Sequence, residues 1–280
     1  VLHGAPGAPA VDVDAVFVAD NVVENLAYGQ FTTYLNFDPD VYDLAVRANG
    51  SPDVVASYRA DITGLAGGTA FVFASGILGG SPAFGLFAAL ADGTVIELPL
   101  TPKTRVQIVH NSPSPTVDVY AGNTLLIDNF EFRTAMPFVD IPADRNISVG
   151  VALDNSSSVN DTITSFAVNF ASGNSYTVFA AGVVGDPLYP FNLYADGNAS
   201  ETGAPGLIGV STFHGLYTPF TLGIDVNERL DGTLFDNVDF GAYTPYSNLT
   251  NEEHYIDVTL ANFTDLLGTH RLDPAVFGGR

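Results

Sequence analysis

Three histidines recur at matching points of the sequence and are its first candidates for chemistry. His3, His110 and His214 are 107 and then 104 residues apart, and a Val-Asp-Val or Ile-Asp-Val segment follows each. The aspartates of these segments are Asp12, Asp118 and Asp225. A histidine facing its aspartate could bind a metal or form an acid–base couple. One histidine and one carboxylate fall short of a metal's usual ligand set, so the sequence favours structural histidines that hydrogen-bond the turn that follows.

Closely spaced aspartates suggest a second kind of site. Asp12 and Asp14 flank one residue, and so do Asp38 and Asp40. Calcium takes about six to eight oxygens, and the sequence contains no Asp-x-Asp-x-Asp-Gly loop. Calcium therefore stays a minor alternative, and we expect no cofactor. The sequence also has no Gly-x-Ser-x-Gly elbow and no phosphate-binding glycine loop with a lysine, so we expect a protein that is not an enzyme.

The histidines belong to a repeat that runs along the whole chain. Residues 27–34 match 131–138 and 240–246, and residues 68–76 match 173–182. A spacing of this size is a domain length and is too long for a solenoid repeat. The sequence therefore predicts three tandem domains, at residues 1–101, 102–204 and 205–280, which we call repeats 1, 2 and 3. Such an array is typical of a scaffold or a binding surface.

Apolar and polar residues alternate with the period of a β-strand. The pattern is clear at residues 10–14, 105–109 and 146–151. Turn residues interrupt it every 8–12 residues or so, the spacing expected of a sandwich. The helical period is nearly absent. We therefore expect an all-β fold of tandem immunoglobulin-like antiparallel β-sandwiches.

The charge balance excludes several classes of partner. Nine basic residues face 31 acidic ones, giving a net charge of −22, and Lys103 is the only lysine. A basic patch for nucleic acid or an anionic membrane is therefore not expected. The sequence also contains no apolar run of the length that spans a membrane. It has no cysteine, which excludes disulfides and thiolate metal sites.

The opening segment and two later blocks resemble a known family. The segments at 3–13 and 110–119 place a proline-rich turn between the histidine and Val-Asp-Val. Together with the blocks at 27–34 and 176–183, they resemble the domain-of-unknown-function family 4397. This resemblance implies secreted or surface-attached domains, often in tandem, with no established enzyme activity and no catalytic residues. It covers repeats 1 and 2 and the first half of repeat 3, which departs from it by losing the proline-rich turn.

Asn-x-Ser/Thr sequons suggest a glycosylated surface protein. Six of them are the candidate glycosylation sites, namely Asn146, Asn155, Asn160, Asn198, Asn248 and Asn262. Composition alone is the alternative explanation. With the acidity and the family resemblance, the sequons predict an extracellular or cell-surface location.

The end of repeat 3 suggests how the protein assembles. The sequence reaches Arg280 without a counterpart of the strand that we expect at 68–76, whose Phe71, Val72 and Phe73 we assign to the core. A sandwich without such strands exposes unpaired backbone and an apolar groove. A strand of a neighbouring subunit, from the region around Val1 or an upstream extension, could fill that groove. A sequence that stops short of the whole protein gives the same pattern.

The leading prediction is therefore an extracellular structural protein, a homopolymer subunit of a surface filament, sheath or layer assembled by β-strand addition. The alternative is a monomeric adhesion or carbohydrate-binding module on the cell surface. A platform of tyrosines would serve that alternative, namely Tyr28, Tyr34, Tyr243 and Tyr246. Their recurrence in the repeats favours core packing instead.

Overall fold

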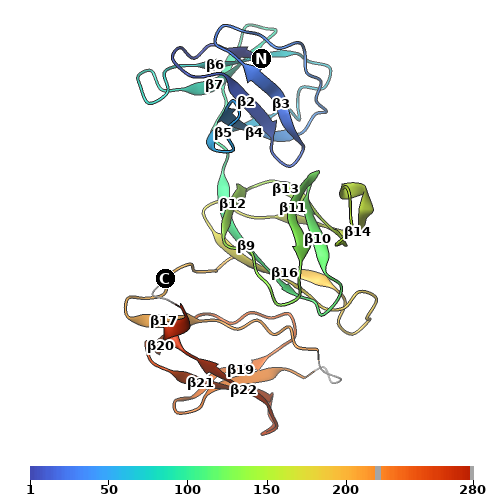
Figure 1. The fold of residues 1–280 in the computed structure, drawn as a ribbon, viewed down its shortest axis with the longest axis vertical. Coiled ribbons are helices and arrows are strands. Elements are labelled where there is room, and N and C mark those ends of the chain that lie inside the picture. The colour runs from blue at the N-terminus through green and yellow to red at the C-terminus, as the bar shows by residue number, and fades with distance from the viewer. Residues whose placement is uncertain (218–221, 278–280) are drawn as a thin grey trace. The chain divides into compact units, whose positions relative to one another are not determined.

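The computed structural model describes residues 1–217 and 222–277, and nearly all of their regular structure is β-strand (Figure 1). The prediction of an all-β fold of tandem sandwich domains is confirmed. The helices in these residues are two 3-10 turns, η1 (Val159–Asp161) and η2 (Pro274–Phe277). No helix in this part of the chain is both long enough and apolar enough to cross a membrane.

One four-stranded sheet recurs in the three repeats with the same strand order. In repeat 1 it is β3 (Ala19–Leu26), β2 (Val11–Ala15), β4 (Val41–Ala48) and β5 (Val54–Asp61). In repeat 2 it is β11 (Thr124–Phe130), β10 (Val117–Ala121), β13 (Asn146–Leu153) and β14 (Thr162–Asn169). In repeat 3 it is β19 (Gly232–Val238), β18 (Ile224–Glu228), β21 (His254–Leu260) and β22 (Leu266–Leu272). In each, the third strand pairs antiparallel with both the second and the fourth.

A second sheet accompanies each of these, and its size differs between the repeats. In repeat 1 it is β1 (Leu2–His3), β6 (Ala70–Ser75), β7 (Gly85–Leu90) and β8 (Val95–Glu97). In repeat 2 it is β12 (Val139–Pro142), β9 (Lys103–Asn111), β15 (Ser175–Ala181) and β16 (Asn192–Asp196). In the described residues of repeat 3 it is β17 (Leu207–Val210) and β20 (Ser247–Thr250).

Contacts divide the chain into two compact units, each described here by itself. The first contains residues 1–104, 117–129 and 141–173, and the second contains 105–116, 130–140 and the chain from 174 onward. This division differs from the three predicted repeats, whose boundaries stay a prediction.

Alternation along the strands determines which residues form the core. In β14, half-buried residues alternate with exposed ones along its whole length, as a strand with one covered face requires. In β6, Val72 and Ala74 belong to the core of repeat 1, whereas Phe71 is 41% exposed and Phe73 stacks on Phe87. The assignment of Phe71 and Phe73 to the core was therefore wrong, because strand alternation puts them on the opposite face of β6.

Candidate functional site

The clearest departure from the repeat pattern lies at β17. This strand pairs antiparallel with β20 along one edge, and its other edge has no strand partner in residues 1–217 and 222–277. In repeat 2 the matching strand β9 lies between β12 and β15, and seven residues of β15 pair with it in parallel. The edge of β17 that faces away from β20 therefore has no paired strand in the described residues, and only its start is occupied, where the Leu207 N–H donates to the Ala204 carbonyl.

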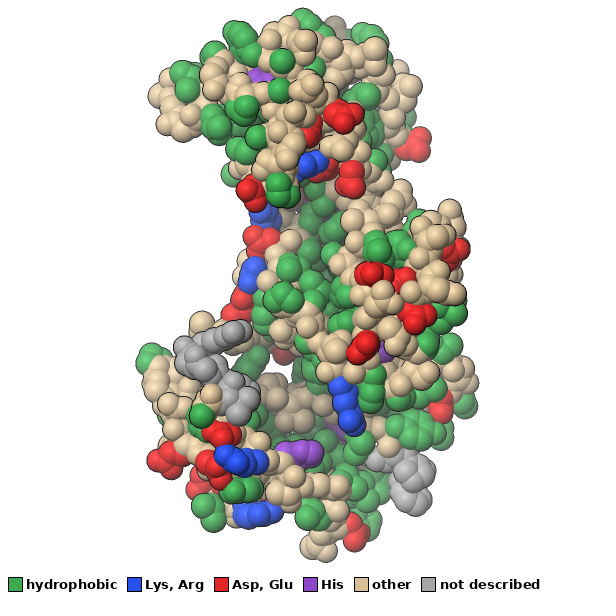
Figure 2. Space-filling view, viewed as in Figure 1, with side chains coloured by type: hydrophobic (Ala, Val, Ile, Leu, Met, Phe, Trp, Pro, Cys, Tyr) green, Lys and Arg blue, Asp and Glu red, His purple; other side chains and the backbone are tan. Residues whose placement is uncertain are grey.

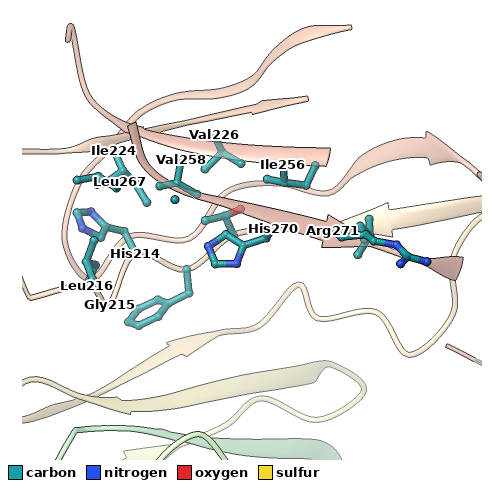
Figure 3. Close-up of a pocket in the computed structure, with 14 residues that line it drawn as sticks. His214, Gly215, Leu216, Ile224, Val226, Ile256, Val258, Leu267, His270 and Arg271 are labelled. Carbon is teal, nitrogen blue, oxygen red and sulfur yellow. The ribbon is translucent and has the colours of Figure 1, made fainter. Parts of the chain in front are cut away.

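An open groove of about 450 Å³ lies in the same repeat (Figure 3). Most of its apolar side chains come from β18, β21 and β22, and Leu267 among them is 42% exposed. Phe213 and Leu216 also line the groove. The residues that line the groove include His214, Ile224, Val226, Ile256, Val258 and Leu267. The groove is thus the inner face of a sheet that remains open to solvent.

The same sheet face is covered in repeat 1. One core cluster there joins residues of both sheets, including Val13 and Tyr58 from one and Ala74 from the other. In repeat 1, Tyr58 of β5 pairs with Leu44 of β4, and its side chain is 5% exposed. The matching pair in repeat 3 is His270 of β22 with Ile256 of β21, and His270 is exposed. The core cluster of buried residues in repeat 3 draws on β18 and β19 alone. Among the described residues, the second sheet of repeat 3 is therefore smaller than that of repeat 1 and covers less of the core.

The recurring histidines are buried, and two of them, His3 and His214, are hydrogen-bonded to the backbone. His3, His110 and His214 are each 1% exposed. The Nε2 atom of His3 lies 2.9 Å from the Pro9 carbonyl oxygen, and the Nδ1 atom of His214 lies 2.8 Å from that of Val238. A carbonyl only accepts, so each of these ring nitrogens donates its N–H. These contacts agree with the structural role that the sequence favours.

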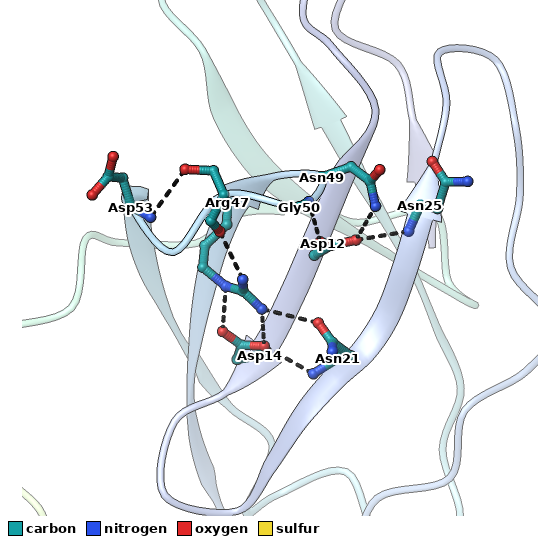
Figure 4. A network of polar contacts seen from close by, with 9 residues as sticks. Asp12, Asp14, Asn21, Asn25, Arg47, Asn49, Gly50 and Asp53 are labelled. Carbon is teal, nitrogen blue, oxygen red and sulfur yellow. Dashed lines mark hydrogen bonds and ion pairs between the residues drawn. The ribbon is translucent and has the colours of Figure 1, made fainter.

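The aspartates bind neighbouring strands instead of the histidines (Figure 4). Asp12 accepts the N–H groups of Asn25 at 2.8 Å and Gly50 at 3.0 Å, and the side-chain amide of Asn49 at 2.9 Å. These donors, the Asn25 N–H first, hold the pKa of Asp12 below its ordinary value. The acid–base couple of His3 and Asp12 is therefore not formed.

The same contact recurs in the other repeats. Asp118 accepts the N–H of Asn129 at 2.9 Å, and Asp225 accepts that of Asn237 at 2.7 Å. The three asparagines share a left-handed backbone, which asparagine tolerates better than most residues: their φ angles are 49° at Asn25, 51° at Asn129 and 54° at Asn237. Each aspartate therefore fixes an irregular turn of the adjacent strand, which is a structural role.

We expect His110→Asn to leave the metal content unchanged and to cost at most about 1–2 kcal/mol of unfolding free energy at pH 7. Neither ring nitrogen of His110 has a well-formed hydrogen bond to the described residues. Burial lowers the pKa of His110 more than the neighbouring Pro115 carbonyl raises it. The unfolded chain therefore binds the proton more readily, and this histidine removes stability as the pH falls below about 6.5.

Urea unfolding at pH 7 and pH 5, with elemental analysis of the protein, checks this expectation. The variant should lose less stability than the wild type between the two pH values. Loss of a stoichiometric metal from the variant would refute the structural role.

The closely spaced aspartates are satisfied by protein groups. Asp14 forms an ion pair with Arg47 at 2.7 Å and accepts the Asn21 N–H, and Asp40 accepts the Val41 N–H. In the described ranges, no group of three His, Asp or Glu side chains is placed to hold a metal ion. These contacts therefore add no support to the calcium alternative.

The most buried charge is one that the sequence analysis missed. Asp43 is fully buried, and the guanidinium groups of Arg59 and Arg145 lie 2.9 and 3.0 Å from its oxygens. Arg59 also donates to the Ala143 carbonyl at 2.7 Å. Asp43 and Arg59 are cross-strand partners, so correct strand register could have revealed that pair. Arg145 comes from the next repeat, so this cluster ties repeat 2 residues to repeat 1.

Aromatic side chains tie repeat 3 to repeat 2 within the second unit. The Tyr243 hydroxyl lies 2.6 Å from the Tyr194 carbonyl oxygen and 3.0 Å from that of Thr177, and Phe213 stacks on Phe179 with ring centroids 4.3 Å apart. Burial raises the pKa of Tyr243. Tyr243 therefore packs between repeats and is not free to bind a ligand.

The other tyrosines of the expected set are exposed. Tyr28 is 59% exposed, Tyr34 84% and Tyr246 41%. The expectation of core packing was wrong for these three. Tyr34 lines a groove of about 490 Å³ in repeat 1, whose lining also includes Phe37 and Phe71. This groove presents aromatic rings to solvent.

The region around Val1 is engaged within its own repeat. Leu2 and His3 pair in parallel with Phe73 and Ala74 of β6. The amino group of Val1 also donates to the Thr32 hydroxyl at 2.8 Å. The expectation that residues around Val1 donate a strand to another subunit therefore loses support.

All six sequon asparagines are exposed. Asn155 and Asn160 flank the start of η1, whose Asp161 accepts the N–H groups of Ser157 and Ser158. Figure 2 shows acidic side chains scattered over the visible face and few basic ones. Exposure is a condition for glycan attachment, so the sequons remain candidate sites.

Comparison with protein families gives one match. The model of the family described as "Domain of unknown function (DUF4397)" matches residues 1–91 and 104–206, which is more than half of the chain. No curated protein matches the chain. The match contains the histidine segments of repeats 1 and 2 and the strands that cover their cores, and no catalytic role comes with it.

Proposed function

We propose that this chain, which belongs to the DUF4397 family of domains of unknown function, is an extracellular structural protein. It acts as a subunit of a surface filament, sheath or layer in which a neighbouring subunit adds a β-strand to repeat 3. The observation that carries this proposal is the open edge of β17 in the same repeat as the uncovered apolar groove.

Unpaired backbone groups and exposed apolar side chains both favour the binding of another strand at the groove. Unpaired backbone groups of an open edge pair readily with another chain, and backbone bonding along an edge is a general mode of peptide recognition. Burying a side chain of the size of Leu or Val is worth about 1.5–3 kcal/mol. An added strand therefore satisfies the edge and covers the groove at once.

The acidic composition of the chain supports an extracellular location. The net charge of −22 and the single lysine keep separate copies apart by repulsion, and salt screens that repulsion. Assembly through backbone pairing and apolar contact should therefore be favoured by the high ionic strength of salty surroundings.

Electron microscopy of the purified chain at high salt tests the function. We expect the wild type to form regular fibres or sheets and Leu267→Arg to remain dispersed, because the arginine places a charge in the groove. Leu267 is 42% exposed, so the change should leave the subunit folded. Leu230→Arg is the matched control, since Leu230 lies outside the groove in the same repeat and is 89% exposed. Dispersed wild type, or polymers of Leu267→Arg, would contradict the proposal.

A second candidate, a monomeric adhesion or carbohydrate-binding module, is favoured by one observation. Tyr28, Phe31 and Tyr34 expose 59%, 63% and 84% of their surface on one repeat, and aromatic rings exposed together are typical of binding surfaces. The same micrographs separate the candidates, because this one predicts dispersed single molecules.

Glycosylation is expected at some of the six sequons, first at Asn155 or Asn160. Both are exposed in a polar segment, Asn155 before η1 and Asn160 within it. Glycopeptide mass spectrometry of the native protein measures the glycan occupancy of both asparagines. Fully unmodified peptides across both positions would refute this expectation.

A further inference from the structure

We infer that the outer face of the second sheet in repeat 1 binds the same face of a second copy of this chain. The face is centred on one row of side chains, Leu2, Phe31, Phe73 and Phe87, which we call the aromatic row of repeat 1. The inference goes beyond the proposed strand addition at repeat 3 and does not depend on it. The packing of repeat 2 against repeat 3 inside the chain shows how such a face is occupied.

Strand pairing places the four side chains in one row. Phe73 of β6 is the partner of Leu2 in β1 and of Phe87 in β7. A bridge joins Leu2 to Phe31. Residues that are directly opposite each other on neighbouring strands share a face of the sheet. Ala74, which follows Phe73, belongs to the core of repeat 1, so alternation along the strand turns the row outward.

Repeat 2 has the same row in the same register. Phe179 of β15 is the partner of Val109 in β9 and of Tyr194 in β16. Both Val109 and its counterpart in repeat 1 come directly before the recurring histidine. Phe179 therefore occupies the place of Phe73. Tyr194 occupies the place of Phe87.

Repeat 3 presents the other half of the row. Phe213 comes directly before the recurring histidine, as Leu2 does in repeat 1. A bridge joins Phe213 to Tyr243, in the same way as the bridge between Leu2 and residue 31. Phe213 therefore occupies the place of Leu2. Tyr243 occupies the place of Phe31.

The two halves pack on each other within the second unit. The Phe213 ring stacks on Phe179 with centroids 4.3 Å apart, and its centroid lies 5.5 Å from that of Tyr194. The Tyr243 ring meets Phe179 edge-on at 5.9 Å. One repeat thus contributes the half on β15 and β16, and the next repeat contributes the half that begins beside its histidine.

Repeat 1 carries both of these halves on one face. Phe73 and Phe87 form the half that repeat 2 uses, and Leu2 and Phe31 form the half that repeat 3 uses. In two copies related by a two-fold axis, each half meets its complement on the other copy, and both contacts form together. The face is therefore complementary to itself, as a symmetric dimer requires.

The face is also exposed and nearly free of charge. Phe31 is 63% exposed, and Phe71, whose ring centroid lies 5.7 Å from that of Phe31, is 41% exposed. In the strands β1, β6, β7 and β8, Glu97 is the only Asp, Glu, Lys or Arg residue. Copies of a chain with a net charge of −22 repel each other. An uncharged face is where a second copy meets the least repulsion.

One difference between the two contacts gives a conservative variant. The Tyr243 hydroxyl lies 2.6 Å from the Tyr194 carbonyl oxygen, whereas Phe31 has no hydroxyl to donate. The contact between copies therefore lacks a hydrogen bond that the contact inside the chain has. Phe31→Tyr should keep the dimer at least as stable as it is with phenylalanine.

Sedimentation equilibrium of the full chain over a concentration series tests the inference. Leu267→Arg is the background, so that strand addition at the groove of repeat 3 does not obscure the result. High salt screens the repulsion between copies, and this chain should sediment as a dimer. Phe31→Asp should raise the dissociation constant of the dimer about hundredfold, because the residue occurs twice in the interface and each copy contributes about tenfold.

The control is Val54→Asp, which adds the same charge to repeat 1 outside the face. Val54 lies in β5 of the first sheet and is 51% exposed, so both aspartate variants should fold. Val54→Asp and Phe31→Tyr should remain dimers. A chain that stays monomeric at every concentration, or Phe31→Asp dimers as stable as those of the parent, would overturn the inference.

Two cysteine variants test the two-fold arrangement. The chain has no cysteine, so Phe31→Cys and Phe73→Cys each carry a single thiol. In a mixed dimer the two thiols meet in one half of the interface, and the other half keeps its two phenylalanines. The mixed disulfide should therefore form faster than the disulfide of either variant with itself. Equal rates, or faster disulfides between identical variants, would overturn the inference.

The results also separate this interface from the proposed function. Wild-type fibres that depend on Leu267, without dimers through repeat 1, would refute this inference alone. Dimers that depend on Phe31, without fibres of the wild type, would refute the proposed function alone.

Discussion

Asp43→Asn is expected to cost about 3–5 kcal/mol of unfolding free energy, the scale measured when one partner of a buried ion pair is removed. Asp43 is fully buried, and its carboxylate is shared by Arg59 and Arg145. The amide would leave two guanidinium groups without a counter-charge in an environment that penalises unpaired charge. Urea unfolding followed by far-ultraviolet circular dichroism measures the change.

The control is Glu253→Gln, which disturbs an exposed ion pair with Arg271. Exposed pairs contribute little to stability, so this variant should unfold like the wild type. Arg145→Met is a second test, because it removes only the partner that comes from repeat 2. It should be milder, since Asp43 keeps Arg59. Equal stabilities of Asp43→Asn and the wild type would contradict the role assigned to the cluster.

Asp12→Ala is expected to cost about 2–4 kcal/mol, because three donors lose their acceptor and hydrogen bonds to a charged group contribute more than neutral ones. The donors are the N–H groups of Asn25 and Gly50 and the side-chain amide of Asn49. The same experiment on exposed Asp20→Ala should show little change.

The pH dependence gives a second readout for Asp12. Its pKa is lowered in the folded state, so its contribution is complete above the ordinary aspartate pKa of about 3.9. The contribution is lost as the pH falls through the lower folded value. The stability gap between the wild type and Asp12→Ala should therefore shrink under acid. A gap that stays constant from pH 7 to pH 2 would show that the carboxylate charge is irrelevant.

Local pattern was enough to predict the fold class and the hydrogen bond of His3 to the turn that follows it. Alternation such as that of residues 146–151 depends only on which strand face is covered, and β13 is found there. The assignment of Phe71 and Phe73 to the core failed because a short apolar run does not reveal which of its two faces points inward. The partner strand decides that, and it comes from a distant part of the sequence.

Long-range contacts explain what the sequence analysis missed. The Asp43 cluster joins residues 102 positions apart, and the Tyr243 hydroxyl lies near a carbonyl 66 positions away. No local spacing encodes such pairs. Tyr28 and Tyr34 stand in the same block as residues that recur in the other repeats, yet they are exposed. Recurrence in the sequence therefore did not indicate burial, because each repeat has different neighbours.

Amide hydrogen exchange at residues 207–215, compared between dispersed and assembled protein, tests the central claim most directly. The N–H groups of Ser211 and Phe213, which follow β17, donate no hydrogen bond within the described residues, and an added strand would take them as donors. The account predicts that these two amides exchange quickly in the dispersed chain and become protected on assembly. Assembled protein in which both amides still exchange as quickly as in the dispersed chain would contradict strand addition at repeat 3.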